Sequence, residues 1–211
     1  MAYLALVRHG ESAWNAQGIW TGITNVELDE EGKENSRKVG EVLKGMDFTV
    51  AFTSKLRRAE ETLTEILKVL GKTDLPIIED AALNERDYGS LTGKNKWEVE
   101  KEYGEEQFES WRRGWDEPVP GGETLKDVYG RVVPFYKNQI LLELLAGKNV
   151  LVVAHGNSLR ALIKYLDDIS DEGVTHLEVH PDEIFIYEID KNGKIIKKEI
   201  KKVDLMESSK Y

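Results

Sequence analysis

Residues 6–12, LVRHGES, follow directly on an apolar run near the start of the chain. An apolar run of strand length that ends in Arg-His-Gly is typical of a buried strand that brings a histidine to the carboxyl edge of a sheet. Open α/β folds bind their ligands at this edge. His9 is therefore a candidate nucleophile.

The same pattern recurs at residues 150–158, VLVVAHGNS, where a β-branched apolar run ends in His155 and Gly156 with a helical stretch behind it. Two strands that each end in His-Gly can place two imidazoles side by side at one edge of a sheet. The repeated pattern gives the first Arg-His-Gly the context that a three-letter motif lacks by itself.

Two further polar segments lie between these strands. Residues 53–59, TSKLRRA, form another junction from strand to helix, and residues 83–89, LNERDYG, place the carboxylate of Glu85 in a segment typical of a turn. Two histidines, several arginines and one glutamate suit phosphoryl transfer to a histidine, because the reaction needs a nucleophile, cations and an acid or base for the leaving oxygen. Arginine suits a phosphate because its planar fork donates two hydrogen bonds to two oxygens.

Six stretches of the chain carry a family resemblance. They are RHGESAWN at 8–15, WTG at 20–22, LNERDYGSLTGKNK at 83–96, YGEEQ at 103–107, WRR at 111–113 and AHGNSLRAL at 154–162. In this order they resemble the histidine phosphatase (phosphoglycerate mutase-like) superfamily, and most closely the cofactor-dependent phosphoglycerate mutases, over residues 3 to about 189. The Arg-His-Gly motif marks the superfamily, whereas the stretch at 83–96 and the WRR motif are similar to the mutases in particular.

The resemblance implies interconversion of 3-phosphoglycerate and 2-phosphoglycerate through a phosphohistidine that 2,3-bisphosphoglycerate primes, with no metal ion. The catalytic residues that it implies are His9, Glu85, His155, Arg8 and Arg58. The substrate-binding residues that it implies are Arg8, Ser12, Asn15, Thr21, Gly22, Arg58, Glu85, Tyr88, Lys96, Arg112, Arg113, Gly156 and Asn157. His9 would carry the phosphoryl group, and Glu85 would exchange a proton with the substrate hydroxyl.

Alternating strands and helices predict an α/β fold, a three-layer sandwich with a mostly parallel central sheet flanked by helices and one antiparallel part. We expect strands at about 3–8, 49–53, 76–78, 149–154, 183–189 and 194–198. We expect helices from residue 29, over about 56–70, over 124–145 with a kink or break at Pro134, and over 158–166. Short helices and aromatic residues at about 92–120 predict a segment that caps the sheet, and residues 201–211 are expected to be a mobile tail.

The length of 211 residues favours a single domain over residues 1–211. The net charge of −10 argues against a nucleic-acid partner, and no apolar run is long enough to span a membrane. The chain has no cysteine and no signal-peptide pattern, so we expect a cytoplasmic protein whose partners are small phosphoglycerates. An acidic protein that binds an acidic substrate must gather its cations at the site.

Two features depart from the family pattern. His176 and His180 lie outside the matching stretches, and we expect neither to take part; the segment around His180 also replaces the small-residue loop that mutases carry there. Only ten positions separate Arg113 from Glu123, which is shorter than in many family members, so the protein is expected to be a monomer or a dimer.

Two alternative functions follow from the same residues. The first is a histidine phosphatase that hydrolyses a small phosphate ester, sharing the catalytic set but releasing phosphate to water. Lys96 and the WRR motif favour the mutase. The second is a binding module without turnover, which is disfavoured because His9 and Glu85 are both present.

Overall fold

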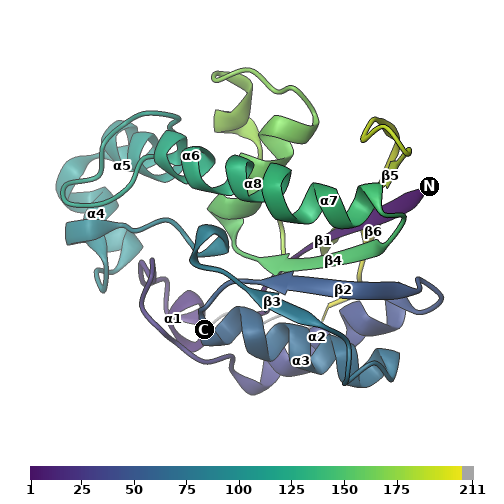
Figure 1. Ribbon diagram of the computed structural model, residues 1–211. Coiled ribbons are helices and arrows are strands. Elements are labelled where there is room, and N and C mark those ends of the chain that lie inside the picture. Colours follow the sequence, from purple (N-terminus) through teal and green to yellow (C-terminus); the bar gives the residue numbers. More distant parts are fainter. Residues whose placement is uncertain (206–211) are drawn as a thin grey trace.

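The computed structural model describes residues 1–205, and these fold around a six-stranded sheet of order β3-β2-β4-β1-β5-β6 (Figure 1). The strands are β1 (Ala2–Arg8), β2 (Phe48–Thr53), β3 (Ile77–Glu79), β4 (Asn149–Ala154), β5 (Glu183–Ile189) and β6 (Ile195–Lys202). The first four pair in parallel, whereas β5 and β6 are antiparallel. The predicted α/β fold with a mostly parallel sheet is therefore confirmed.

Helices cover both faces of this sheet. On one face lie α2 (Glu30–Leu43) and α3 (Arg57–Leu70), and on the other lie α6 (Leu125–Phe135), α7 (Leu141–Leu145) and α8 (Gly156–Leu166), as Figure 1 shows. Alternate residues of β1 accordingly belong to different cores: Leu4 and Leu6 pack toward α6 and α8, and Ala5 and Val7 toward α2 and α3. Burial on both faces explains why the central strands read as continuous apolar runs.

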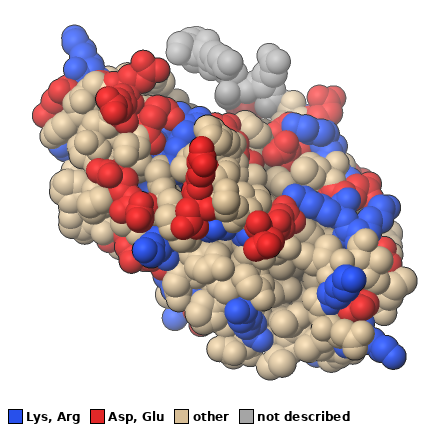
Figure 2. All heavy atoms as spheres, turned by 90° about the horizontal axis from the view of Figure 1, so that it is seen from above, with Lys and Arg blue, Asp and Glu red and all other residues tan. Residues whose placement is uncertain are grey.

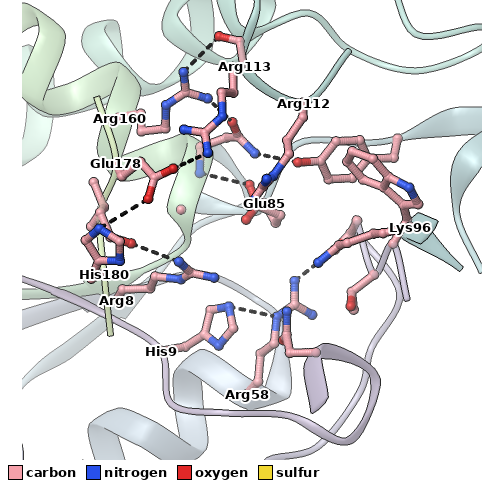
Figure 3. Close-up of a pocket in the computed structure, with 18 of the residues that line it drawn as sticks. Arg8, His9, Arg58, Glu85, Lys96, Arg112, Arg113, Arg160, Glu178 and His180 are labelled. Atoms are coloured by element: carbon pink, nitrogen blue, oxygen red, sulfur yellow. Dashed lines mark hydrogen bonds and ion pairs between the residues drawn. The ribbon is translucent and has the colours of Figure 1, made fainter. Parts of the chain in front are cut away.

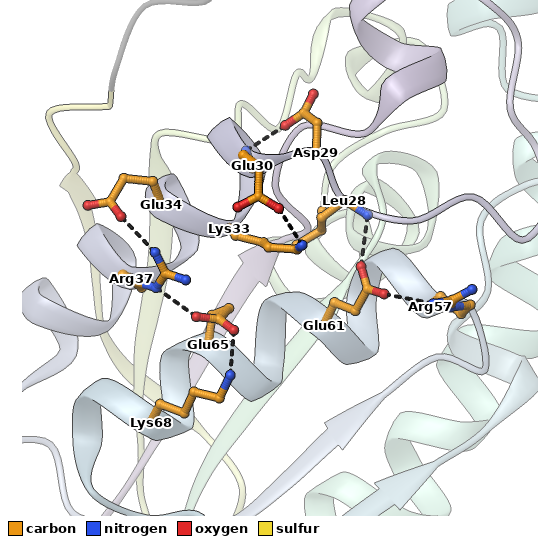
Figure 4. A network of polar contacts seen from close by, with 11 residues as sticks. Leu28, Asp29, Glu30, Lys33, Glu34, Arg37, Arg57, Glu61, Glu65 and Lys68 are labelled. Carbon is orange, nitrogen blue, oxygen red and sulfur yellow. Dashed lines mark hydrogen bonds and ion pairs between the residues drawn. The ribbon is translucent and has the colours of Figure 1, made fainter.

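Local signals set the ends of the helices. The Asp29 carboxylate accepts a hydrogen bond from the Gly32 N–H at 2.6 Å at the start of α2, and Gly71 ends α3 with a φ of +65°. Polar contacts then join the outer faces of these two helices, among them an ion pair of 2.7 Å between Arg37 Nε and Glu65 Oε2 (Figure 4). α8 begins at Gly156, two residues before the predicted Ser158. Its N-cap is His155, the first residue after β4.

The long helix predicted over 124–145 is interrupted, as Pro134 indicated. α6 ends at Phe135, a π-helical turn follows over Tyr136–Ile140, and α7 completes the segment. Proline has no N–H to donate to the preceding turn. The helix accommodates the missing hydrogen bond by changing locally from α-helical to π-helical hydrogen bonding.

The segment at about 92–120 has a small core of its own at the carboxyl edge of the sheet. It contains α4 (Lys96–Tyr103) and α5 (Glu105–Arg113), and Phe108 and Trp111 are buried there with Trp20 and Tyr88. Trp97 does not belong to this core, since 64% of its surface is exposed. The remaining turns are α1 (Ala13–Ala16), η1 (Ala81–Leu83), η2 (Gly89–Leu91) and η4 (Gly173–His176).

Residues 201–205 belong to the fold, contrary to the mobile tail predicted from residue 201. β6 continues four residues past the predicted end at residue 198, and Val203 is buried against the core between the sheet and α2 and α3. Edge-strand pairing with β5 orders these residues despite their many lysines. The rest of the predicted tail, 206–211, lies outside the described residues. In residues 1–205 no helix is long and apolar enough to cross a membrane.

Candidate active site

The ends of β1 and β4 bring the two strand-end histidines together. Arg8 and Ala154 are paired in the parallel ladder, and the N–H of His9 donates to the Ala154 carbonyl at 2.9 Å. The residue that follows each strand therefore lies beside its counterpart, and the rings of His9 and His155 have centroids 4.9 Å apart. The two His-Gly junctions predicted this side-by-side arrangement, and both imidazoles are buried.

The hydrogen bonds of His9 fix which ring nitrogen is nucleophilic. Nδ1 lies 2.7 Å from the Gly10 carbonyl oxygen, which can only accept, so Nδ1 carries the proton and Nε2 carries the lone pair. Burial, Arg58 and Arg8 together hold the pKa of His9 well below its ordinary value, although the bond to Gly10 acts in the opposite direction. A neutral imidazole whose Nε2 carries no proton is the form that can attack a phosphoryl group.

Arg58 lies against this lone pair. Its Nε donates to His9 Nε2 at 3.4 Å, and its two terminal nitrogens donate to the Thr24 and Gly22 carbonyls at 2.9 and 2.8 Å. The side chain is 1% exposed, and burial lowers its pKa to about 10, so it stays charged at neutral pH. A buried cation held by two carbonyls is preorganised for charge on a phosphoryl group.

Glu85 is held with one oxygen committed to the backbone. Oε1 accepts from the Arg86 N–H at 2.8 Å and from the Asn157 N–H at 3.1 Å. Asn157 also donates from its side chain to the Tyr88 hydroxyl at 2.8 Å. Oε2 is therefore the oxygen that remains for proton exchange.

Arg131 of α6 supports the loop that carries Glu85. Its guanidinium donates to the carbonyls of Ala82 and Asn84, at 2.7 and 2.9 Å, and to that of Glu85, at 3.1 Å. Glu123 holds the same guanidinium through two bonds of 2.8 and 2.9 Å. This contact network fixes the position of a loop that has no regular secondary structure around Glu85.

A pocket opens above the histidines, with His9 and Arg58 on one side and Lys96, Arg112 and Arg113 around its outer part (Figure 3). Six basic side chains line it: those of Arg8, Arg58, Lys96, Arg112, Arg113 and Arg160. On the face that Figure 2 shows, acidic and basic side chains are interspersed. Burial and the positive charge of nearby Arg112 lower the pKa of Lys96, because both disfavour its charged form. Cations thus gather at one place in a protein of net charge −10.

The structure brings most of the predicted site residues to this pocket. Its lining includes Arg8, His9, Asn15, Thr21, Gly22, Arg58, Glu85, Tyr88, Lys96, Arg112, Arg113, Gly156 and Asn157. Ser12 and His155 do not line it. Ser12 is buried and donates to the Asn15 side-chain oxygen at 2.5 Å, so it orients a lining residue. His155 lies behind His9, with its Nε2 2.7 Å from Ser54 Oγ.

Seven lining residues were not assigned to the site from the sequence: Ile19, Trp20, Arg160, Leu177, Glu178, Val179 and His180. Arg160 lies one turn after Asn157 on α8 and donates to its side-chain oxygen at 2.9 Å, a spacing that could have indicated it. His180, which was not expected to take part, lines the pocket, and its Nε2 lies 3.2 Å from Glu178 Oε2. His180 lies in an irregular segment before β5, where no helical or strand periodicity indicates the direction of a side chain.

These groups are the components of phosphoryl transfer: a neutral nucleophile, cations beside it and a carboxylate with one free oxygen. Within residues 1–205 there is no group of three or more His, Asp or Glu side chains that could hold a metal ion.

Residues 4–200 match the histidine phosphatase superfamily (branch 1). The 2,3-bisphosphoglycerate-dependent phosphoglycerate mutase of Parvibaculum lavamentivorans is 46% identical over 199 residues, which cover 93% of this chain and 95% of that protein. A protein of Gloeobacter violaceus with the name 2,3-bisphosphoglycerate-dependent phosphoglycerate mutase 2 is 49% identical over 179 residues, covering 85% and 82% of the two chains.

Solved structures share the fold at lower identity. Bacillus stearothermophilus YhfR superposes with a TM-score of 0.79 at 25% identity, covering 97% of this chain and 96% of its own. A mycobacterial glucosyl-3-phosphoglycerate phosphatase superposes with a TM-score of 0.80 at 21% identity, covering 97% and 99%. The second likeness concerns the fold alone.

Proposed function

Because the chain belongs to the histidine phosphatase superfamily and, within it, to the 2,3-bisphosphoglycerate-dependent phosphoglycerate mutases, we propose that it interconverts 3-phosphoglycerate and 2-phosphoglycerate through a phosphohistidine at His9. The observation that carries this proposal is the buried Nε2 lone pair of His9 beside Arg58, at the inner end of a pocket lined by basic groups.

The donor set of the pocket fits a ligand with two anionic ends. Arg8 and Arg58 would hold one phosphate near His9, and Lys96, Arg112 and Arg113 would hold the carboxylate and the second phosphate. When bound, 2,3-bisphosphoglycerate supplies the phosphoryl group that primes His9. No metal ion takes part in the proposal, because fixed guanidinium groups carry the charge. Small phosphoglycerates are then the partners of the protein. We expect it in the cytoplasm, as a monomer or a dimer.

The phosphoryl transfer divides into two half-reactions. In one, a bond forms between His9 Nε2 and phosphorus while the ester P–O bond breaks, and Glu85 Oε2 gives a proton to the leaving oxygen. In the other, Glu85 takes the proton of the substrate hydroxyl as that oxygen attacks phosphorus and the N–P bond breaks. Arg8 and Arg58, which line the pocket, would hold the equatorial oxygens. Burial and nearby Arg58 lower the pKa of His155, so it is neutral before the reaction.

Product analysis tests this function and its phosphatase alternative together. The purified protein is incubated with 3-phosphoglycerate, with and without 2,3-bisphosphoglycerate, and both 2-phosphoglycerate and inorganic phosphate are measured. We expect 2-phosphoglycerate to form, faster with the primer, and little phosphate to be released. Phosphate as the main product would replace the mutase with a histidine phosphatase.

A further inference from the structure

One wall of the pocket carries a negative charge directly beside the cations. Leu177, Glu178, Val179 and His180 line the pocket together, in the segment between η4 and β5. Figure 3 shows the Glu178 carboxylate between Arg113 and His180, on the side of the pocket that Arg8 also borders. A carboxylate here is unexpected in a pocket proposed to bind anions.

Arg113 has a carboxylate partner on each of two nitrogens. Its Nε lies 2.5 Å from Glu109 Oε2, and its terminal Nη2 forms an ion pair with Glu178 Oε1. Glu109 belongs to the same helix and lies outside the lining of the pocket, whereas Glu178 lies inside it. A ligand anion that enters the pocket therefore finds the Nη2 donor of Arg113 already bound to the Glu178 carboxylate.

Glu178 is ionised in this arrangement. Burial acts to raise the pKa of its carboxyl, but the hydrogen bond and the charge of Arg113 outweigh burial, and the net shift is downward. A charged carboxylate and a ligand anion repel each other and cannot both occupy the same donors.

The surroundings of Glu178 allow it to leave Arg113. Its second oxygen, Oε2, lies 3.2 Å from His180 Nε2, which remains as a partner when Oε1 is released. Glu178 also lines a second hollow, together with Arg113, Glu109 and His176, so space is available to its side chain.

We propose that Glu178 determines ligand specificity by competing with the distal anionic group of the ligand for Arg113. The proposal rests on the proposed function, which assigns Arg113 to that group. A ligand with two anionic ends must displace Glu178, whereas inorganic phosphate, which needs only the donors around His9, need not. Glu178 thus weakens the binding of phosphoglycerates relative to that of a single phosphate.

The substitution Glu178→Gln tests this competition, since the amide keeps the size of the side chain and removes its charge. We expect the KM for 3-phosphoglycerate to fall by about threefold to tenfold, as the loss of a competing, partly exposed ion pair allows. The inhibition constant of inorganic phosphate should change by less than about twofold, because that anion binds away from Arg113 and salt screens the distant charge. A gain of affinity is a result that a damaged fold would not give.

The matched control is Glu109→Gln. It removes the other carboxylate partner of Arg113, which also pairs with Arg112 at 3.4 Å, and it leaves the Glu178 carboxylate in the pocket. Its KM for 3-phosphoglycerate should not fall. An unchanged or higher KM in Glu178→Gln, an equal fall in Glu109→Gln, or an equal gain for inorganic phosphate would each overturn the proposal.

The two proposals can fail separately. If the unsubstituted protein forms no 2-phosphoglycerate, the proposed function fails. Calorimetric binding of 3-phosphoglycerate to the unsubstituted protein and to Glu178→Gln then still measures the competition, because it does not depend on turnover. Tighter binding to the variant supports the role of Glu178, and equal or weaker binding refutes it.

Discussion

Substitution of Glu85 by glutamine should remove proton transfer while preserving the geometry around residue 85. In the structure Glu85 Oε1 accepts two backbone N–H groups, from Arg86 and Asn157, and Oε2 is left for the substrate. A glutamine side chain satisfies the same two donors only with its carbonyl oxygen, which places its NH₂ group where Oε2 was. That group can neither take a proton from a hydroxyl nor deliver one to a leaving oxygen.

The size of the effect follows from this replacement. General acid–base catalysis contributes about 10² to 10⁴ in rate, which is about 2.7–5.4 kcal/mol of transition-state free energy. The kcat of Glu85→Gln should fall by this factor. The KM should stay within about threefold of the original value, because the amide keeps the contacts and removes a negative charge from an anion-binding pocket.

The assay is steady-state formation of 2-phosphoglycerate from 3-phosphoglycerate at saturating 2,3-bisphosphoglycerate, with circular dichroism as the control for folding. Full turnover in a folded Glu85→Gln protein would refute the assignment and place the acid or base elsewhere. A large rise in KM with unchanged kcat would show that Glu85 only binds the substrate.

Three further predictions concern the groups around Glu85 and His9. The pKa of His9 is lowered, so its neutral, nucleophilic form should persist below pH 6.5 and be lost only as the pH falls through the lower value; an NMR titration midpoint at or above 6.5 would contradict this. Arg131→Lys should lower kcat about tenfold and the melting temperature by about 2–8 °C, since the three donors of an ammonium cannot replace the five hydrogen bonds that the guanidinium makes; unchanged kcat would leave Arg131 without a positioning role. Vanadate should inhibit at low concentration and EDTA by itself should not, because protein donors carry the charge; activity lost on chelation and restored by a divalent ion would contradict the metal-free proposal.

The central sheet and the inner part of the site were predictable from the sequence because both depend on strand ends. Val7 and Val153 lie in runs that are buried on both faces, and such runs are recognisable without any partner information. β1 and β4 are parallel neighbours whose ends are in register, so the residues that follow them, His9 and His155, lie together.

The outer wall of the site was not predictable in the same way. Glu178 and His180 lie in an irregular segment, where side-chain direction depends on tertiary contacts rather than on a period. The end of β6 was missed for a related reason: residues 195–202, IIKKEIKK, lie on an exposed edge strand and lack the alternation of a half-buried one. Val203 packs into the core although lysines precede it.

The position of the phosphoryl group on the protein decides whether His9 is the nucleophile. After reaction with 2,3-bisphosphoglycerate, intact mass should rise by about one phosphate in an acid-labile form, as a phosphohistidine requires. Phosphorus and nitrogen NMR of the labelled protein should place phosphorus on Nε2 of His9, because Nδ1 is committed to the Gly10 carbonyl. His9→Ala should take up no label. Phosphorus on Nδ1, on another residue, or still present in His9→Ala would contradict the account.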